Sequence, residues 1–272
     1  MLNHQQILHF RTFGYVLLPG LLTRAETQTL HSEVTDALTD AFGVLGTEPD
    51  DLGGISGDYL PLSVDRAPFS QSLIADDRRT FQYSAELLGH PTVPSAGLAT
   101  CFTGDSTWHT RLGPAIGGVT FWVDLEPRTA ATGALRVIAG SHLPEFEQRL
   151  CEYRAVEPAS SGFEAWNWPH VVIETEPGDV VAFGGHLMNC AQGGLPRLTW
   201  TIDYLPWPGL ADTGQLKLVR DLTLDDVEYD HEDYDRDRWP VWREWAAGAA
   251  RSASRATAVE RLKLLGVLTD DS

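Results

Sequence analysis

Apolar positions in the first third of the chain recur with helical spacing. Leu30, Val34 and Leu38 repeat every fourth residue, which predicts a helix of about five turns with one buried stripe. Thr23 followed by Glu26 is typical of a capping box at the start of that helix. The same part of the chain predicts an amphipathic start at 5–10, a strand at 14–19 closed by Pro-Gly, a loop at 43–57 and two shorter helices near 70–75 and 78–88.

From Thr92 the pattern changes to short apolar runs separated by turn residues, among them Glu-Pro-Gly-Asp at 176–179. Helices before these strands and after them indicate a mainly β protein with flanking helices, in which a jelly-roll core is covered on one face. The expected strands are 96–102, 119–125, 135–138, 171–174, 180–183, 187–190 and 198–205, with helices at 143–153, 240–250 and 256–265.

The sequence contains no internal repeat and no low-complexity linker, so we expect a single domain over residues 1–272. Within it, residues 1–91 form a helical N-terminal part, residues 92–206 the β core and residues 207–272 a C-terminal helical extension.

Composition and charge narrow the class of partner. Hydrophobic residues make up 43% of the chain, which includes 9 tryptophans, as in a packed globule. The net charge of −18 disfavours nucleic acid and anionic membranes as partners. The acidic run at 225–237 lacks the spacing of a calcium loop and is interpreted as a solvated surface segment.

The cellular location follows from what the sequence lacks. No run of 18 apolar residues indicates a transmembrane helix, and residues 1–11 do not have the pattern of a secretory signal. The 3 cysteines are odd in number and widely spaced, which is typical of reduced thiols. We therefore expect a cytoplasmic protein.

Two stretches carry the candidate chemistry. The first, 104–142, contains G-D-S-T-W-H-T-R, an apolar run at 119–123 and G-A-L-R-V-I-A-G-S-H. The second, 178–204, begins G-D-V-V-A-F-G-G-H-L-M-N. Together they resemble the phytanoyl-CoA dioxygenase-like (PhyH) branch of the Fe(II)/2-oxoglutarate oxygenases. That resemblance implies a double-stranded β-helix (jelly-roll, cupin-like) core and a role in tailoring small molecules.

The resemblance also implies where iron would bind. In this family two histidines and one carboxylate hold the ion: an H-x-D or H-x-E triplet and a histidine six residues past the phenylalanine of the second motif. Here the triplet is His109-Thr110-Arg111, and Asn189 lies six residues past Phe183. The nearest histidine, His186, comes three residues early. We therefore expect a degenerate triad and no bound iron.

A guanidinium in the carboxylate position does more than fail to coordinate. At ~4 Å and an effective dielectric constant near 20, two unit charges interact by roughly 4 kcal/mol, and a divalent ion would be repelled about twice as strongly. The family grips 2-oxoglutarate with an arginine on a late strand, and Arg197 is the candidate, although it also fits a surface position at a strand end.

Other residues have both a functional and a structural interpretation. His109, His142 and His186 could be catalytic or pocket residues, or ordinary structural histidines. Trp108, Trp122 and Trp200 are interpreted either as core or as the wall of an aromatic pocket for a hydrophobic or polycyclic ligand.

Three functions from different classes remain open. The first is a metal-independent enzyme for a redox-neutral step (cyclisation, isomerisation or elimination), with His109 as acid/base and Arg111, Asn189 and His186 as its polar partners. The second is an Fe(II)/2-oxoglutarate oxygenase with rearranged ligands. The third is a non-catalytic binding or partner protein.

Overall fold

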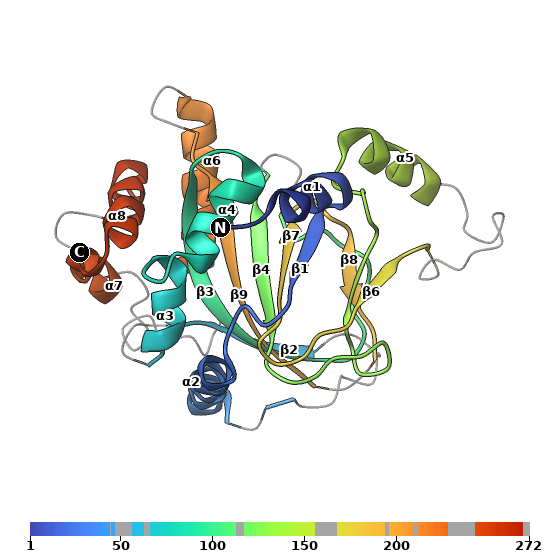
Figure 1. Cartoon of the computed structure of the whole chain (residues 1–272), viewed down its shortest axis with the longest axis horizontal. Coiled ribbons are helices and arrows are strands. Elements are labelled where there is room, and N and C mark those ends of the chain that lie inside the picture. The colour runs from blue at the N-terminus through green and yellow to red at the C-terminus, as the bar shows by residue number, and fades with distance from the viewer. Residues whose placement is uncertain are drawn as a thin grey trace.

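Two antiparallel sheets face each other at the centre of the fold (Figure 1). The computed structural model describes residues 1–43, 45–46, 56–62, 66–112, 117–155, 168–193, 196–208, 212–227 and 243–268. The larger sheet has six strands in the order β1-β7-β4-β9-β3-β2, and the smaller has three in the order β6-β5-β8. The predicted class, a β core of the jelly-roll type with flanking helices, is confirmed.

The strands are β1 (Tyr15–Leu18), β2 (Ser56–Pro61), β3 (Thr92–Thr103), β4 (Val119–Asp124), β5 (Leu135–Val137), β6 (Val171–Ile173), β7 (Val180–Gly184), β8 (Asn189–Ala191) and β9 (Arg197–Pro206). The helices are α1 (His4–Phe13), α2 (Arg24–Phe42), α3 (Pro68–Ala75), α4 (Arg79–Leu88), α5 (Pro144–Arg154), α6 (Thr213–Val227), α7 (Arg243–Ala247) and α8 (Ala253–Leu265).

Helix α2 forms where the sequence predicts it and for the predicted reason. The Thr23 hydroxyl accepts a hydrogen bond from the backbone N–H of Glu26, and the Glu26 carboxylate accepts one from the Thr23 N–H, at 3.3 and 2.7 Å. The stripe residues Leu30, Val34 and Leu38 are completely buried. They belong to the main hydrophobic cluster, which joins the helices to the large sheet.

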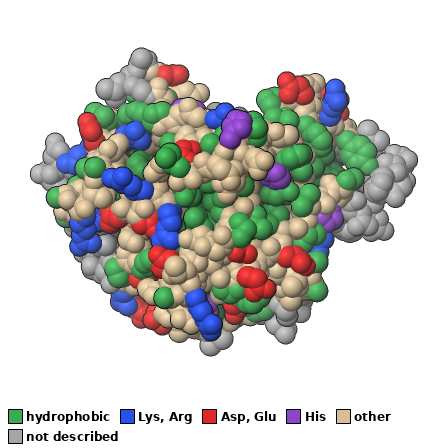
Figure 2. Space-filling model, in the orientation of Figure 1, with side chains coloured by type: hydrophobic (Ala, Val, Ile, Leu, Met, Phe, Trp, Pro, Cys, Tyr) green, Lys and Arg blue, Asp and Glu red, His purple; other side chains and the backbone are tan. Residues whose placement is uncertain are grey.

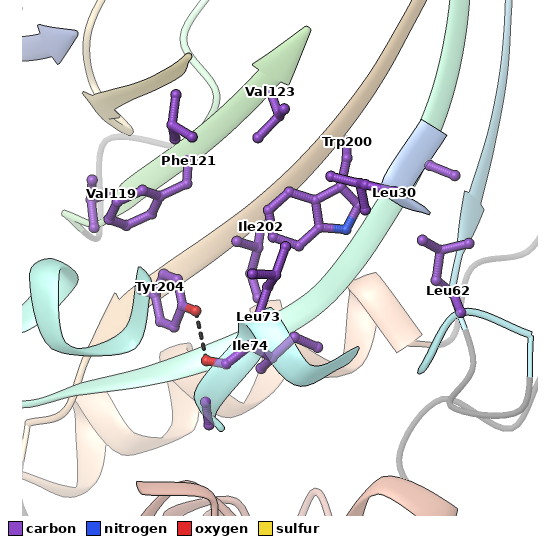
Figure 3. Packing of buried hydrophobic residues seen from close by; sticks show 14 of the residues in the cluster. Leu30, Leu62, Leu73, Ile74, Val119, Phe121, Val123, Trp200, Ile202 and Tyr204 are labelled. Carbon is purple, nitrogen blue, oxygen red and sulfur yellow. Dashed lines mark hydrogen bonds between the residues drawn. The ribbon is translucent and has the colours of Figure 1, made fainter. Parts of the chain in front are cut away.

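That cluster lies on one face of the large sheet only. Figure 3 shows Phe121 of β4 and Trp200, Ile202 and Tyr204 of β9 directed toward α2 and α3. The Tyr204 hydroxyl donates to the Ile74 carbonyl of α3 at 2.7 Å. The helices therefore cover this face, and the opposite face of the sheet is left for the candidate site.

Two elements differ from the sequence-based expectation. Strand β2 begins within the predicted loop, and the sequence did not predict it because its Gly, Asp and Pro residues disfavour strand. It forms at the edge of the large sheet, where β3 is its one pairing neighbour. Helix α6 was not predicted. Where the sequence predicts a helix at 240–250, the described residues form α7 and a short 3₁₀ turn at 249–251. Most of the acidic run at 225–237 lies outside the described residues.

Apolar side chains remain exposed on the surface around α1 and α5. Figure 2 shows hydrophobic side chains gathered on the face that carries these helices. Within the described ranges, no helix is both long enough and apolar enough to cross a membrane. The exposed large hydrophobic residues near α1, α5 and β6 are Leu8, Phe13, Leu143, Phe146, Tyr153 and Val171.

Candidate functional site

The face of the large sheet that points away from the helices is mostly polar along β9 and its neighbours β3 and β4, whereas Val181 and Phe183 of β7 make it apolar beside them. Successive side chains of a strand alternate between its two faces. The β9 residues that alternate with Trp200, Ile202 and Tyr204 therefore face the small sheet. Their cross-strand neighbours on β3 and β4 continue the same face. We call this set the interior polar face: Arg197, Thr199, Thr201 and Asp203 of β9, Thr120 and Asp124 of β4, and Thr100 of β3.

His109 and Asn189 lie directly opposite each other. They form an antiparallel bridge in which the His109 N–H donates to the Asn189 carbonyl at 3.0 Å and the Asn189 N–H donates back at 2.9 Å. Asn189 also pairs with Val137, whose side chain packs between the two sheets. Paired residues of an antiparallel ladder point to the same face, so both side chains are directed to the interior.

The tautomer of His109 is set by a neighbouring carbonyl. Its Nδ1 lies 2.8 Å from the carbonyl oxygen of Thr107. A carbonyl can only accept, so Nδ1 carries the proton and Nε2 keeps its lone pair in the neutral ring. The side chain is exposed. Nε2 is therefore the basic atom that a ligand would meet.

The amide of Asn189 is held by backbone carbonyls. Its Nδ2 donates to the carbonyls of His109 and Leu187 at 3.2 and 3.0 Å, and the residue is only 4% exposed. This orientation uses both amide hydrogens and leaves Oδ1 as an acceptor.

Arg111 makes an ion pair with a residue of the interior polar face. Its Nε donates to Asp203 Oδ2 at 3.1 Å and its Nη2 to Thr201 Oγ1 at 3.4 Å. The other carboxylate oxygen of Asp203 accepts from the Thr120 hydroxyl. The Asp203 side chain is 5% exposed and that of Arg111 26%. Arg111 thus reaches across from the His109 segment to β9.

Asp203 is the residue that sequence reasoning missed. A carboxylate between Ile202 and Tyr204, in the apolar strand W-T-I-D-Y, was the available signal. Burying a charge is unfavourable unless it is paired, so a lone acid in a buried strand indicates a partner nearby. The partner, Arg111, lies 92 residues away in the sequence, and no local spacing connects the two.

Arg197 is buried, contrary to its alternative interpretation as a surface residue. It is 2% exposed, and its Nη1 has no hydrogen-bond partner. Within the described part of the chain, its guanidinium makes no hydrogen bond or ion pair. Burial lowers the pKa of Arg197, and the nearby Arg128 cation lowers it further, whereas Asp105 and Asp124 oppose this more weakly. Asp124 is held by Trp122 and by Thr175, at 2.9 and 2.8 Å, and burial raises its pKa.

Gly133, at the start of the G-A-L segment, leaves the space that Arg197 fills. A Cβ added at Gly133 would lie 2.6 Å from Arg197 Cδ, and the backbone there has φ +96°. Both facts require glycine. The motif glycine therefore fixes the position of the arginine stem.

We expect Gly133→Ala to displace Arg197 and to destabilise the fold by about 1–3 kcal/mol, the combined effect of overpacking and an unfavourable φ. Thermal unfolding measures the loss. Gly20→Ala is the matched control, because Gly20 also has positive φ (+59°) but nothing lies within 4 Å of an added Cβ. Equal losses in the two variants would show that crowding against Arg197 has no effect.

The three tryptophans of the predicted pocket lie in three places. Trp122 packs in the cluster between the two sheets. Trp108 lies on the outer side of the small sheet, where it stacks on Trp168 with ring centroids 6.3 Å apart. Trp200 packs against α3, where its Nε1 donates to Ser70 Oγ at 2.6 Å, as Figure 3 shows for the ring. Of the two interpretations of Trp200, the structure favours the core, because the alternation of β9 turns it to the helix side.

The other two predicted histidines, His142 and His186, lie near each other. His142 Nε2 lies 3.2 Å from the Arg11 carbonyl at the end of α1, and the ring contacts Gly14. His186, in the turn after β7, is close enough to lower the pKa of His142, although burial is the larger cause. These contacts place His142 and His186 at the junction of α1, β1 and β7.

The donors at the candidate site fit a metal ion and 2-oxoglutarate to different degrees. Among the described residues, no three His, Cys, Asp or Glu side chains lie close enough to hold a metal. At the positions that the motifs indicate, His109 is the one imidazole, beside an amide and a guanidinium paired with Asp203. This donor set does not fit Fe(II). Arg197, a buried cation with an orphaned Nη1, does fit a carboxylate such as that of 2-oxoglutarate.

Solved structures with the same fold come from several enzymes. The α-ketoglutarate-dependent carbocyclase SnoK from nogalamycin biosynthesis aligns with a TM-score of 0.60 at 17% identity, over 79% of this chain and 90% of that one. The epimerase SnoN from the same biosynthesis aligns at 0.56 and 18%, over 74% and 82%. EctD from S. alaskensis with bound Fe aligns at 0.57 and 22%, over 76% and 77%. These likenesses establish the fold. No curated protein sequence matches the chain.

A family comparison covers most of the sequence. The phytanoyl-CoA dioxygenase (PhyH) family matches residues 10–192, which include His109, Arg111, Gly133 and Asn189 and end before Arg197. The match extends over more than half of the chain, over the whole of the first motif and over the second as far as residue 192. The chain therefore belongs to the phytanoyl-CoA dioxygenase family.

Proposed function

We propose that the protein is a small-molecule tailoring enzyme that has lost the iron triad of its family and catalyses a redox-neutral step without a metal. One observation carries the proposal: Arg111 occupies the position of the carboxylate ligand and is ion-paired with Asp203. By the spacing of the first motif, this guanidinium takes the place of a negatively charged ligand, which supports the loss of cation binding. Asn189, in the position of the second histidine, is a neutral and weak ligand.

The residues present support proton transfer. His109 Nε2 is the base, since Nδ1 is committed to the Thr107 carbonyl. It removes a proton from a carbon or hydroxyl of the substrate. In an isomerisation or cyclisation the proton returns elsewhere on the same molecule, and in an elimination it goes to the leaving group, which departs with the electron pair of its bond, so that no electrons are gained or lost overall. The Arg111 guanidinium stabilises the negative charge that develops, and Asn189 hydrogen-bonds to the substrate. Cyclisation, isomerisation and elimination all fit this sequence of steps.

The relatives support a role in biosynthesis. SnoK is described as a carbocyclase and SnoN as an epimerase, both from nogalamycin biosynthesis and both dependent on α-ketoglutarate. An epimerase changes the configuration of its substrate, and a change of configuration leaves the oxidation level of the carbon skeleton unchanged. For this chain we propose a similar class of product and a different source of catalysis.

Metal content tests the proposal. Purified protein incubated anaerobically with excess Fe(II) and 2-oxoglutarate, then desalted, should hold well under one equivalent of iron, because two strong ligands are missing. It should also form no succinate. Elemental analysis and succinate determination measure the two quantities.

Stoichiometric iron, or succinate formed together with a product, would contradict this and favour an oxygenase with rearranged ligands. A protein that converts no candidate substrate yet binds a partner tightly would favour the non-catalytic function. The matched control is Arg111→Asp with Asn189→His, which restores the family's donor set; a rise in bound iron shows that the assay detects a working site.

A further inference from the structure

Strand β1 forms one edge of the large sheet, and among the described residues no strand pairs with its outer side. It pairs with β7, where Tyr15 lies opposite Phe183, and the next residue of β7, Gly184, donates its N–H to the Gly14 carbonyl at 2.8 Å. Hydrogen-bonded and non-hydrogen-bonded pairs alternate along an antiparallel ladder. The N–H and C=O groups of Tyr15 and Leu17 therefore point away from β7, and within the described ranges they have no hydrogen bond.

Apart from its short length, nothing in the sequence of β1 protects this edge. The strand reads Y-V-L-L, without a charge, a proline or a bulge. Strand β2, at the opposite edge of the same sheet, contains Asp58 and Pro61. Charged residues and proline discourage the pairing of an edge with another chain, and β1 lacks both.

A groove of about 490 Å³ follows the edge of β1, with α1 on one side and β6 on the other (Figure 1). Three consecutive β1 residues line it, and since successive side chains point to opposite faces, the groove lies along the edge itself. On the β6 side it is apolar: Val171 is 37% exposed, and Tyr15 and Leu17 pack against the cluster that contains Ile173. On the α1 side the lining is polar, with the side chains of Asn3, Gln5, Gln6 and His9.

The two ends of the groove differ in charge. Glu174, the carboxylate among the lining residues, follows β6 and precedes the turn to Val180, which pairs with Leu18. It therefore lies at the end of the groove where β1 ends. At the other end, the His9 ring contacts the Tyr15 ring edge-on, with centroids 5.0 Å apart. A strand antiparallel to β1 would begin at the acidic end.

These features favour a single extended peptide over a second folded copy. A second copy could pair with β1 only if the edge protruded, whereas α1 and β6 border it on both sides. A strand added to β1 directs alternate side chains to the apolar β6 side and to the polar α1 side. The matching sequence therefore alternates apolar and polar residues.

We propose that this groove binds an extended peptide segment of a partner protein, which adds a strand to the large sheet, antiparallel to β1. Backbone hydrogen bonds to Tyr15 and Leu17 provide affinity, and the alternate apolar side chains contact the β6 side of the groove. A Lys or Arg that precedes the apolar residues pairs with Glu174. The groove shares no residue with the site around His109, so this interaction is independent of the proposed reaction.

A defined peptide tests the proposal. The probe is fluorescently labelled Lys-Lys-Val-Thr-Val-Thr-Val, and the anisotropy of its fluorescence measures binding. We expect saturable binding with a dissociation constant below about 1 mM. Residues opposite Tyr15 and Leu17 share their face and direct their own N–H groups to β1, so these residues are the valines. N-methylation of the valine amides should weaken binding at least about tenfold, and N-methylation of the threonine amides by less than about twofold.

Protein variants locate the peptide on β1. Leu17→Pro removes an N–H that points outward while the bonds to β7 remain, and should weaken binding at least about tenfold. Leu17→Ala is its matched control, because it shortens the same side chain, keeps that N–H and should weaken binding by less than about threefold. Glu174→Gln still accepts from the Ala130 N–H, as Glu174 does at 2.9 Å. It should weaken the lysine probe by up to about fivefold and leave a probe with serine in place of lysine unaffected.

Hydrogen exchange reads the same contact in the unsubstituted protein, whether or not the proline variant folds. In the free protein the amides of Tyr15 and Leu17 should exchange faster than those of Val16 and Leu18, which bond to β7. Saturating peptide should slow the exchange of the Tyr15 and Leu17 amides at least about tenfold.

Four results would overturn the proposal. No saturable binding up to about 1 mM peptide would show that the groove does not take a strand. Equal effects of the two N-methylations, or unchanged exchange at Tyr15 and Leu17 in the complex, would place the peptide elsewhere. A dimer in which these amides are protected without peptide would assign the groove to a second copy. None of these measurements depends on iron or turnover, so the metal-content test of the proposed function can succeed or fail separately.

Discussion

His109→Asn should reduce turnover by about 10²–10⁴-fold, the contribution of a single acid/base group. The substituted amide can still donate to the Thr107 carbonyl, as His109 Nδ1 does at 2.8 Å, so local structure should survive. What disappears is the basic Nε2. Product formation followed by mass spectrometry, in EDTA and without oxygen, measures the loss.

His90→Asn is the matched control for that experiment. His90 is also exposed and also places Nδ1 near a carbonyl, that of Pro91 at 3.1 Å, but it lies in the loop between α4 and β3. Turnover should stay within about twofold of the unsubstituted protein. If His109→Asn were equally harmless, His109 would be a structural residue and the proposed proton transfer would be wrong.

Asp203→Ala should produce the largest loss of stability among substitutions near the site. It leaves Arg111 without its carboxylate and Thr120 without its acceptor. Breaking a buried ion pair from one side costs about 3–5 kcal/mol. We expect about 3 kcal/mol, the lower end, because Arg111 is 26% exposed and water screens part of its charge. For a chain of this size that lowers the melting temperature by roughly 6–12 °C.

Two further variants separate the ion pair from general damage. Arg111→Met combined with Asp203→Leu removes both charges and should recover most of the lost stability. Asp221→Ala breaks the exposed pair that Asp221 makes with Lys217 at 2.8 Å, whose side chains are 49% and 76% exposed, and should change the melting temperature by less than about 1 °C. A double variant as unstable as Asp203→Ala would contradict a stabilising charge pair.

Regular periodicity made most of the fold predictable. The stripe of Leu30, Val34 and Leu38 and the cap at Thr23 depend only on neighbours in sequence, and the structure confirms both. Strand β2 was missed because its pairing with β3 is set by tertiary contact and not by its own residues. In it, Gly57 faces the ring of Phe102, so close that an added Cβ would lie 1.9 Å from it. The strand propensities of single residues do not include such a close contact between neighbouring strands.

The site was predictable in its parts and not in its connections. The two motifs located His109 and Asn189, which the structure pairs in one bridge. They gave no indication that Arg111 would be held by Asp203 or that Arg197 would be buried without a partner. Charge pairing across strands depends on which faces meet. A shift of one residue in strand register moves every side chain to the other face of the sheet. Trp200, for example, lies on the helix side, while its sequence neighbours Thr199 and Thr201 lie on the opposite face.

Because β9 alternates between an apolar face and a polar face, its positions differ in what a substitution would disturb. Randomising Thr199 and Thr201 would alter small buried side chains whose hydroxyls bond to Thr100 and Arg111, and would leave the hydrophobic cluster on the other face intact. Randomising Trp200, Ile202 or Tyr204 would yield mostly unfolded chains, since all three are large side chains of that cluster and pack against the helices. Adjacent codons of this one strand therefore offer very different evolvability.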